Sequence, residues 1–263
     1  MTQPTARAHG DRQGTVHIEH CMGTVFTIDI REPGNWADAI RGVVSWLHEV
    51  DRVFSTYRDD SDISRLQRSE ITLDAAHPDV ANVLDLCAQA QLSTGGHFTA
   101  MPNGQLDPTG LVKGWAIEQA SRRLTAYGAA NHAINGGGDL QLVGEAASGR
   151  PWTVGVSDPR ESSRVLTVVS GRDFAAATSG IAERGAHVID PFTGAPATRA
   201  LSATVTGPSL TWADAYATAA LVMGASAVRW IADVDDNEAL VVAPGGTCYR
   251  SAGWSISADV RFR

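Results

Sequence analysis

Apolar and polar positions follow two different periods along the chain, and these periods separate predicted helices from predicted strands. Apolar residues at helical spacing predict helices over 35–54, 77–96, 112–128 and 211–223, with a continuation through 226–233 left open. Asn35 suits the cap of the first helix, and Pro78 falls in the first turn of the second. Gly95 and Gly128 lie where the second and third helices should end.

Shorter β-rich runs occupy both ends of the chain. Segment 15–30 alternates enough to predict strands with a turn at Gly23. Further runs bounded by Gly, Pro and Asp lie at 131–144, 152–158, 164–171, 200–207, 238–244 and 254–260. Helices and strands mix without a β-α-β alternation, so the predicted class is α+β. The polar segment 1–14 predicts a disordered tail, and 15–263 predicts a single domain.

Composition narrows the classes of function. The hydrophobic content of 43% and charged content of 19% are ordinary for a soluble globular protein. A net charge of -8 argues against sequence-independent nucleic-acid binding. The three cysteines are far apart and indicate free thiols in a reducing compartment. The N-terminus shows no apolar signal segment, and the most apolar run, around 217–228, is too short for a membrane span. We therefore expect a cytoplasmic protein without membrane contact.

The predicted helix "TWADAYATAALVMG" (211–224) contains a carboxylate among alanines. Asp214 and Thr218 are four residues apart, so a helix places both on one face. A carboxylate facing so apolar a surface is costly unless it is paired or bound to a cation. Two oxygen ligands on one turn suit Mg²⁺. The alternative is that Asp214 caps the helix start and Thr218 bonds back to a carbonyl.

Two glycine-containing stretches could hold an anion. In "LDPTGLVKGW" (106–115) a turn feeds a helix N-terminus, where free N–H groups and Lys113 could meet a phosphate. An ordinary turn with a solvated lysine explains it equally well. In "INGGGDLQLVG" (134–144) Gln141 stands where a dinucleotide fingerprint needs its third glycine. A hairpin loop is therefore the simpler interpretation of this second stretch.

A third stretch, "TSGIAERGAHVIDPFTGAP" (178–196), concentrates polar groups in a turn-rich span. Ser179, His187 and Asp190 invite comparison with a hydrolase triad, but "TSGIA" lacks the G-x-S-x-G elbow. His187 stands beside apolar residues and by itself favours a structural role. The stretch alone therefore predicts no hydrolase.

Together these stretches resemble the ApbE family, the FAD:protein FMN transferases. The resemblance runs from Met22 to Gly224. It rests on "MGT" (22–24), "STY…SDISRL" (55–66), "GGHF" (95–98), "DPTGLVKGW" (107–115), "INGGGD" (134–139), "TSG…R..H.IDP.TG.P" (178–196) and "ADAYATA" (213–219). It implies an α+β, T-fold-like architecture with mostly antiparallel sheets, packed helices and two intertwined lobes with the site between them.

The resemblance also implies a reaction and its participants. The FMN half of FAD would pass to a threonine or serine hydroxyl of an acceptor flavoprotein, with Mg²⁺ required and AMP released. Asp214 and Thr218 would be Mg²⁺ ligands together with the backbone carbonyl of Gly110, which replaces the capping interpretation of Asp214. His187 would be the base that activates the acceptor hydroxyl.

Further matched positions would contact the dinucleotide. Met22 and Tyr57 would line the ring-binding region, where Tyr57 suits stacking. The residues placed along FAD, with Lys113 at a phosphate, are His97, Phe98, Thr99, Asp107, Lys113 and Ile189. Asp139 and Arg184 would be structural or support the ligands.

Departures from the family pattern lie near residue 99. Thr99 stands where relatives often have an acid, and a longer insertion is reduced to "TAMPNGQ" (99–105). Many relatives are exported lipoproteins, but no lipobox is visible, so an intracellular acceptor is expected. Two other functions stay open: hydrolysis of FAD to FMN and AMP, and flavin binding without chemistry.

Overall fold

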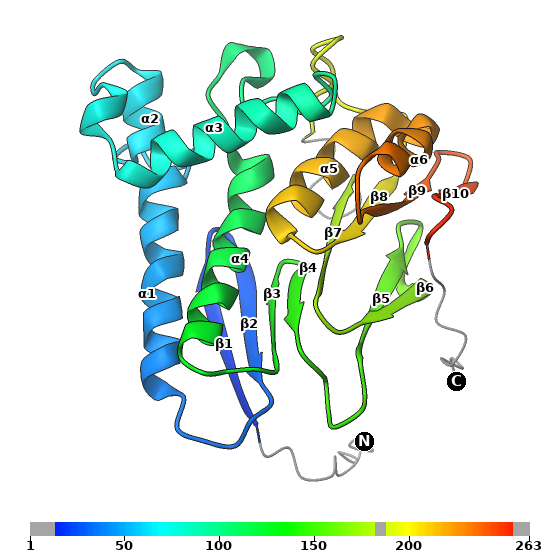
Figure 1. Ribbon diagram of the computed structural model, residues 1–263. Coiled ribbons are helices and arrows are strands. Elements are labelled where there is room, and N and C mark those ends of the chain that lie inside the picture. Colours follow the sequence, from blue (N-terminus) through cyan, green and yellow to red (C-terminus); the bar gives the residue numbers. More distant parts are fainter. Residues whose placement is uncertain (1–13, 182–187, 255–263) are drawn as a thin grey trace, which may run out of the picture.

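The computed structural model describes residues 14–181 and 188–254, and within them the class predicted from sequence is confirmed. An eight-stranded sheet has the order β1-β2-β3-β4-β7-β8-β9-β10, and a separate hairpin pairs β5 with β6 (Figure 1). The strands are β1 Thr15–Cys21, β2 Thr24–Ile30, β3 His132–Gly136, β4 Asp139–Val143, β5 Trp152–Asp158, β6 Glu161–Gly171, β7 Phe174–Gly180, β8 Ser202–Gly207, β9 Glu238–Val242 and β10 Cys248–Arg250. Every strand pairing in the described part is antiparallel.

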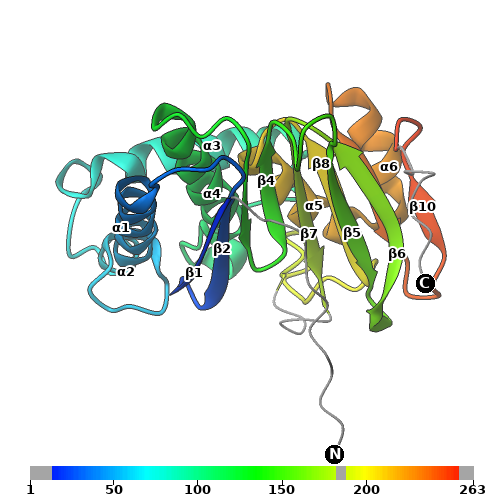
Figure 2. The ribbon, with the colours of Figure 1, turned by 90° about the horizontal axis from the view of Figure 1, so that it is seen from below.

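Helices cover one face of this sheet. They are α1 Ala37–Phe54, α2 Asp62–Gln67, α3 Pro78–Ser93, α4 Thr109–Ala126, α5 Leu210–Met223 and α6 Ala227–Trp230, with short 3-10 turns at Leu73–Ala75, Pro102–Gly104, Gly224–Ser226 and Ile231–Asp233. Helix α4 lies over β3 and β4, and α5 lies over β7 and β8. Figure 2 shows the strands running from β1 at one end of the sheet to β10 at the other.

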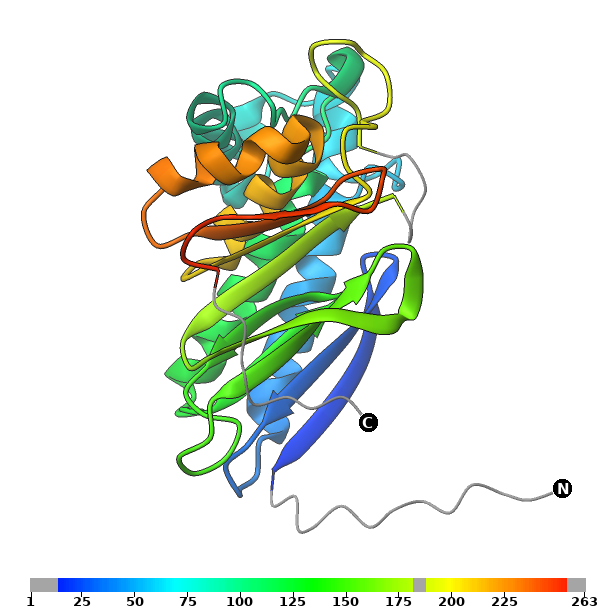
Figure 3. The ribbon, with the colours of Figure 1, turned by 90° about the vertical axis from the view of Figure 1, so that its right-hand side faces the viewer.

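The β5–β6 hairpin packs on the opposite face of the sheet (Figure 3). Leu140 and Leu240 point to the hairpin, where they meet Val154 and Val169. Gln141, next to Leu140 in β4, points to the helices, because its side chain accepts from the Leu210 N–H at 3.1 Å. The alternation of the strands thus separates a hairpin-facing layer from a helix-facing layer.

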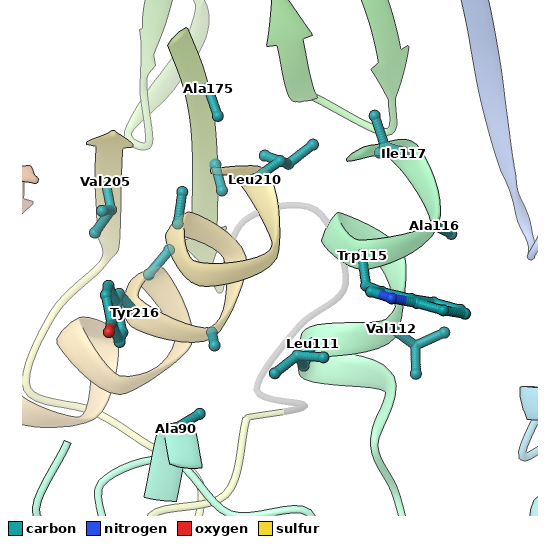
Figure 4. Packing of buried hydrophobic residues seen from close by; sticks show 14 of the residues in the cluster. Ala90, Leu111, Val112, Trp115, Ala116, Ile117, Ala175, Val205, Leu210 and Tyr216 are labelled. Atoms are coloured by element: carbon teal, nitrogen blue, oxygen red, sulfur yellow. The ribbon is translucent and has the colours of Figure 1, made fainter. Parts of the chain in front are cut away.

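The main core lies between the sheet and the helices. It joins residues from β2, α1, α4, α5 and β9 in one cluster. In Figure 4, Leu111 points from α4 toward α5, whereas Trp115 points to the other side of α4. Trp115 there meets Trp46 and Phe54 of α1 in edge-to-face contacts with ring centroids 5.1 and 5.6 Å apart. The division into two lobes stays a prediction.

Several predicted boundaries are confirmed, and others shift. Pro78 opens α3, and Gly23 and Gly128 adopt positive φ at the predicted turns. Helix α4 begins at Thr109, three residues earlier than predicted, because the Asp107 carboxylate accepts the Thr109 N–H at 3.0 Å. Asn35 precedes the cap residue of α1, yet its side chain accepts the Ala37 N–H at 3.1 Å.

Two strands and the short helix α2 were not predicted. The last three residues of β7, 178–180, belong to the stretch 178–196, which the sequence analysis described as turn-rich. The alanine run "FAAAT" at the start of β7 has low β-strand propensity. Strand β10 has only three residues. The predicted strand 254–260 lies outside the described residues beyond Trp254, as do residues 1–13 of the predicted tail.

The apolar C-terminal helical segment includes the continuation through 226–233 that the sequence analysis left open. Leu210–Asp233 is long and apolar enough to cross a membrane by length and composition, which corrects the prediction that the run is too short. Most of its apolar window is nevertheless buried inside the protein. Contacts of α5 with α4, β7 and β8 are those of a core helix.

Candidate functional site

Helices α4 and α5 run antiparallel and meet through small residues. On α4, Gly110 and Gly114 lie on the face toward α5. A methyl group added at Gly114 would stand 2.7 Å from the Asp214 Cβ, and one added at Gly110 would stand 3.6 Å from the Thr218 Oγ1. Glycine therefore permits the close approach that brings the Gly110 backbone beside the Thr218 hydroxyl.

Asp214 lies inside α5 and is 4% exposed, so the alternative interpretation, in which it caps the helix, is wrong. Its Oδ2 accepts the Gly114 N–H at 2.9 Å, and its Oδ1 lies 3.4 Å from the Lys113 Nζ. In a regular helix the acceptor for the Gly114 N–H is the Gly110 carbonyl. The carboxylate thus competes for that proton and leaves the Gly110 oxygen more available to another partner.

Lys113 lies between two buried carboxylates. Its ammonium forms an ion pair with Asp139, the first residue of β4, and faces Asp214 on the other side. Asp139 Oδ1 also accepts the Thr178 N–H of β7 at 3.0 Å. The three ionised side chains carry a formal charge of -2 + 1 = -1. One further cation is therefore electrostatically favourable here.

The Thr218 hydroxyl connects α5 to the sheet. Its Oγ1 lies 3.2 Å from the Ser179 Oγ near the end of β7. Asp139 and Ser179 come from two separate glycine-bearing stretches. Together with the two helices, the fold therefore brings four of the sequence motifs together. Sequence reasoning did not assign Ser179 to this group, because only strand pairing brings it there.

The chemistry of these donors fits a hard divalent cation. A carboxylate, a hydroxyl and a backbone carbonyl supply oxygen only, which is the donor set that Mg²⁺ prefers. Within residues 14–181 and 188–254, no group of three or more His, Cys, Asp or Glu side chains is arranged to hold a metal. A site for a softer ion such as Zn²⁺ has no support in that part of the chain.

Residues 97–99, which were predicted to contact FAD, lie in the loop after α3, and only Phe98 among them is buried. Phe98 is 1% exposed and lies beneath Gly110, where an added methyl would stand 3.2 Å from its ring. His97 donates from Nδ1 to the Thr94 carbonyl at 2.9 Å, and its ring meets exposed Phe192 edge-on at 4.8 Å. Thr99 Oγ1 accepts the Met101 N–H at 3.1 Å.

The remaining predicted contacts are spread over other loops. Tyr57 follows α1 and is 97% exposed. Met22 holds φ 51° in the β1–β2 turn, a left-handed conformation that a bulky residue rarely adopts. Ile189 forms an isolated bridge with Pro196. Asp107 sits at the turn into α4, where it accepts the Thr109 N–H.

His187 and Arg184 lie outside the described residues. The base assigned to His187 therefore stays a prediction, as do the individual FAD contacts and the Mg²⁺ ligands. What the structure does bring together is the set Gly110, Lys113, Asp214 and Thr218, joined by Asp139.

The fold has three layers, and it brings a buried carboxylate, a lysine and a hydroxyl together where α4 packs on α5. The chain belongs to the ApbE family, whose sequence profile matches residues 22–102 and 99–241. It is 27% identical over 284 residues to the FAD:protein FMN transferase of Vibrio cholerae, with 84% of this chain and 85% of the relative covered.

Other relatives match over shorter stretches. The FAD:protein FMN transferase of Treponema pallidum is 32% identical over 187 residues, which cover 63% of this chain and 52% of the relative. Among solved structures, the flavin transferase ApbE of Vibrio cholerae superposes with a TM-score of 0.80 at 22% identity, covering 91% of this chain and 97% of that one. The ApbE protein of Thermotoga maritima gives 0.81 at 21% identity with the same coverage. These structural similarities establish the fold.

Proposed function

We propose that this protein transfers the FMN moiety of FAD to a threonine or serine hydroxyl of an acceptor flavoprotein, in a reaction that needs Mg²⁺ and releases AMP. Membership of the ApbE family supports flavin transfer as the general activity. The observation that carries the finer proposal is the buried Asp214 beside Thr218 and Gly110, an oxygen donor set with a net negative charge at the end of two helices.

Each residue has a distinct part in the proposed reaction. Asp214, Thr218 and the Gly110 carbonyl would hold Mg²⁺, which when bound offsets negative charge on the pyrophosphate. Lys113 would face a phosphate oxygen as a point charge, and Asp139 holds the ammonium in place. This arrangement binds and orients the dinucleotide, which is the main source of catalysis in phosphoryl transfer.

The bond changes are balanced without an oxidant or reductant. The acceptor hydroxyl oxygen attacks the phosphorus on the FMN side of the pyrophosphate, and the bond from that phosphorus to the bridging oxygen breaks. AMP leaves with the bridging oxygen. The hydroxyl proton passes to a base, for which His187 is the candidate.

Mass spectrometry of a candidate acceptor, incubated with FAD, Mg²⁺ and the full chain, tests this function. A gain of one FMN on a threonine or serine, with one AMP released, is the expected result. A parallel incubation without acceptor separates the alternatives. Rapid AMP release there indicates hydrolysis of FAD, and retention of intact FAD in both incubations indicates a flavin-binding protein without chemistry.

The base is tested separately by His187→Ala. We expect slower transfer with FAD affinity largely retained, because the imidazole would act on the acceptor hydroxyl and not on FAD. A collapse of FAD affinity would instead make His187 a ligand contact.

A further inference from the structure

Glu118 connects α4 to the beginning of α5. It is a largely buried carboxylate on α4, two turns beyond Gly110 on the face that carries Gly114. Its Oε2 accepts from the Ser209 hydroxyl at 2.6 Å, from the Thr211 N–H at 3.0 Å and from the Thr211 hydroxyl at 2.7 Å. One oxygen of one side chain thus receives three donors from the first turn of the neighbouring helix.

These contacts replace the cap that α5 lacks. Ser209 occupies the N-cap position, yet its side chain makes no capping hydrogen bond within its own helix. Two of the free N–H groups of the first turn are satisfied from outside the helix, that of Thr211 by Glu118 and that of Leu210 by Gln141 of β4. A negative charge at a helix N-terminus is favourable, so Glu118 supplies both an acceptor and a charge.

The carboxylate is held in its ionised form. Burial acts to raise the pKa of Glu118, but the hydrogen bonds from Ser209 and Thr211 outweigh it and hold the pKa below its usual value. Arg122 adds a donor to the other oxygen, Oε1, at 2.5 Å. The two oxygens therefore have separate partners, with α5 on one side and a surface arginine on the other.

The register of α5 on α4 follows from this attachment. Glu118 meets Thr211, Gly114 meets Asp214, and Gly110 meets Thr218, at intervals of about one helical turn on each side. A helix fixed at its first turn cannot slide or rotate along its partner without breaking these hydrogen bonds. The separation of the two proposed α5 ligands from the Gly110 carbonyl therefore depends on Glu118.

We propose that Glu118 is a positioning residue, which sets the register of α5 on α4 and thereby the geometry of the oxygen donors Gly110, Asp214 and Thr218. The proposal rests on the proposed function, because it takes these three donors as the Mg²⁺ site. Glu118 itself touches neither metal nor dinucleotide. Its effect is expected in metal affinity, before any effect on FAD.

Glu118→Gln tests this role with little change in volume. If the amide oxygen faces α5, the amide NH₂ group faces the Arg122 guanidinium, and in the reverse orientation it faces the α5 donors. We expect the Mg²⁺ concentration for half-maximal transfer to rise about tenfold, which is typical when support of a metal ligand is lost. At saturating Mg²⁺ the KM for FAD should stay unchanged.

Arg122→Ala is the matched control. Arg122 contacts the same carboxylate, but its side chain is 66% exposed and bonds only to Oε1. Loss of such a surface pair should change the Mg²⁺ requirement by less than about twofold. Ser209→Ala, which removes one of the three α5 donors, should give an intermediate increase and keeps the test available if Glu118→Gln folds poorly.

Titration of the full chain with Mn²⁺, followed by electron paramagnetic resonance, measures metal affinity without turnover. Weaker Mn²⁺ binding in Glu118→Gln and Ser209→Ala, with wild-type binding in Arg122→Ala, supports the proposal. A lower thermal midpoint with wild-type Mn²⁺ affinity and Mg²⁺ requirement would reduce Glu118 to a structural residue and overturn it. Absence of Mn²⁺ binding in the wild type would overturn it as well.

The two proposals can fail separately. If the wild type binds Mn²⁺ but transfers no FMN, the proposed function fails, and the affinities of the variants still decide the role of Glu118. If transfer occurs and Glu118→Gln binds Mn²⁺ normally, the function stands and the positioning role fails.

Discussion

The two ends of the candidate site differ in how completely the protein assembles them. At the metal end, Asp214 is buried between α4 and α5, and its two oxygens already face the Gly114 N–H and Lys113. At the ring-binding end, Tyr57 projects from a turn and is almost fully exposed. Under the proposed function, the cation site is therefore preorganised, whereas the residue proposed to stack on a ring gains its contacts only when a ligand is present.

The difference has a physical origin in the elements that carry each end. Asp214 and Thr218 are held by the packing of two core helices together with the hydrogen bonds between them, because a shift of either helix would disturb the whole cluster. Tyr57 and Phe192 lie on loops, whose side chains have few neighbours to hold them. Substitutions at the metal end should therefore have larger effects than substitutions at the ring-binding end.

Among these substitutions, Asp214→Ala should have the largest effect on transfer. Loss of the carboxylate removes the charged member of the donor set, so Mg²⁺-dependent transfer should fall by about a thousandfold or more. The fold should survive, because alanine is a better helix former than aspartate and the ion pair between Lys113 and Asp139 remains. Transfer rates and circular dichroism measure the two effects.

Asp173→Ala is the control for that substitution. Asp173 also accepts one backbone N–H, from Gly144 at 2.8 Å, but it is exposed and directly precedes β7. Its loss should leave transfer intact. Unchanged activity in Asp214→Ala would contradict the metal assignment.

Gly114→Ala should separate the two helices that form the metal end. The added methyl would meet the Leu210 backbone carbonyl and the Asp214 Cβ, so α5 must move. We expect a loss of about 1–3 kcal/mol in the free energy of unfolding. The Mg²⁺ concentration for half-maximal transfer should rise as well, because the proposed ligands on α5 move. Chemical denaturation measures the first effect and Mg²⁺ titration of transfer the second.

Gly245→Ala serves as the comparison, because a methyl group there meets no atom within 4 Å. It should change the unfolding free energy by less than about 0.5 kcal/mol. Equal stability of the two variants would show that the helices can adjust, and the close packing would then have no role in the site.

Tyr57→Ala tests the proposed ring-binding end and should reduce activity less than the substitutions at the metal end. Stacking on a ligand ring contributes about 0.5–1.5 kcal/mol, so the KM for FAD should rise by about two- to tenfold. Stability should not change, because the side chain has almost no contacts to lose. Tyr249→Ala on β10 is the matched aromatic control. A stability loss without any change in KM would contradict the ring-binding role.

The smallest effect is expected for the pH dependence of stability that His132 causes. This residue links β3 to α4. It is fully buried on β3, donates from Nδ1 to the Ala129 carbonyl and accepts from the Ser121 hydroxyl at 2.7 Å. Burial lowers the pKa of His132 and outweighs the hydrogen bond to Ala129, which acts to raise it. The unfolded chain therefore binds this proton at a higher pH than the folded protein does.

The sign of the pH dependence follows. Stability from neutral His132 is complete above the unfolded pKa of about 6.5 and is lost as the pH falls below it. Denaturant titrations between pH 5 and 8 measure this slope, roughly the window around an unperturbed histidine. His132→Gln should flatten it. An equally steep slope in the variant would assign the dependence to other groups.

Thiol chemistry offers no competing centre at the two buried cysteines. Burial raises the pKa of Cys21 to about 11 and that of Cys87 to about 12, so both remain protonated thiols at neutral pH. The expectation of free thiols is confirmed for Cys21, Cys87 and Cys248.

Local pattern was sufficient for most of the helices and for the class of fold. Helices α1, α3 and α5 appear within a few residues of their predicted limits, because apolar spacing and terminal Pro or Gly are properties of the nearby chain. The pairing of Asp214 with Thr218 was likewise accessible, since one helical turn fixes it. The alanine-rich strand β7 was not, because its conformation depends on pairing with β4 and β8.

By itself the sequence determined that a carboxylate and a hydroxyl would share one turn of an apolar helix, and that the chain carries the motifs of the ApbE family in order. Only the tertiary structure decided what surrounds that carboxylate: Gly114 close enough to donate, Lys113 drawn between Asp139 and Asp214, Ser179 beside Thr218, and Glu118 at the start of α5. The reason is that these partners lie 35 to 101 positions from Asp214 along the chain. Distances between such residues are set by packing, which local periodicity does not encode.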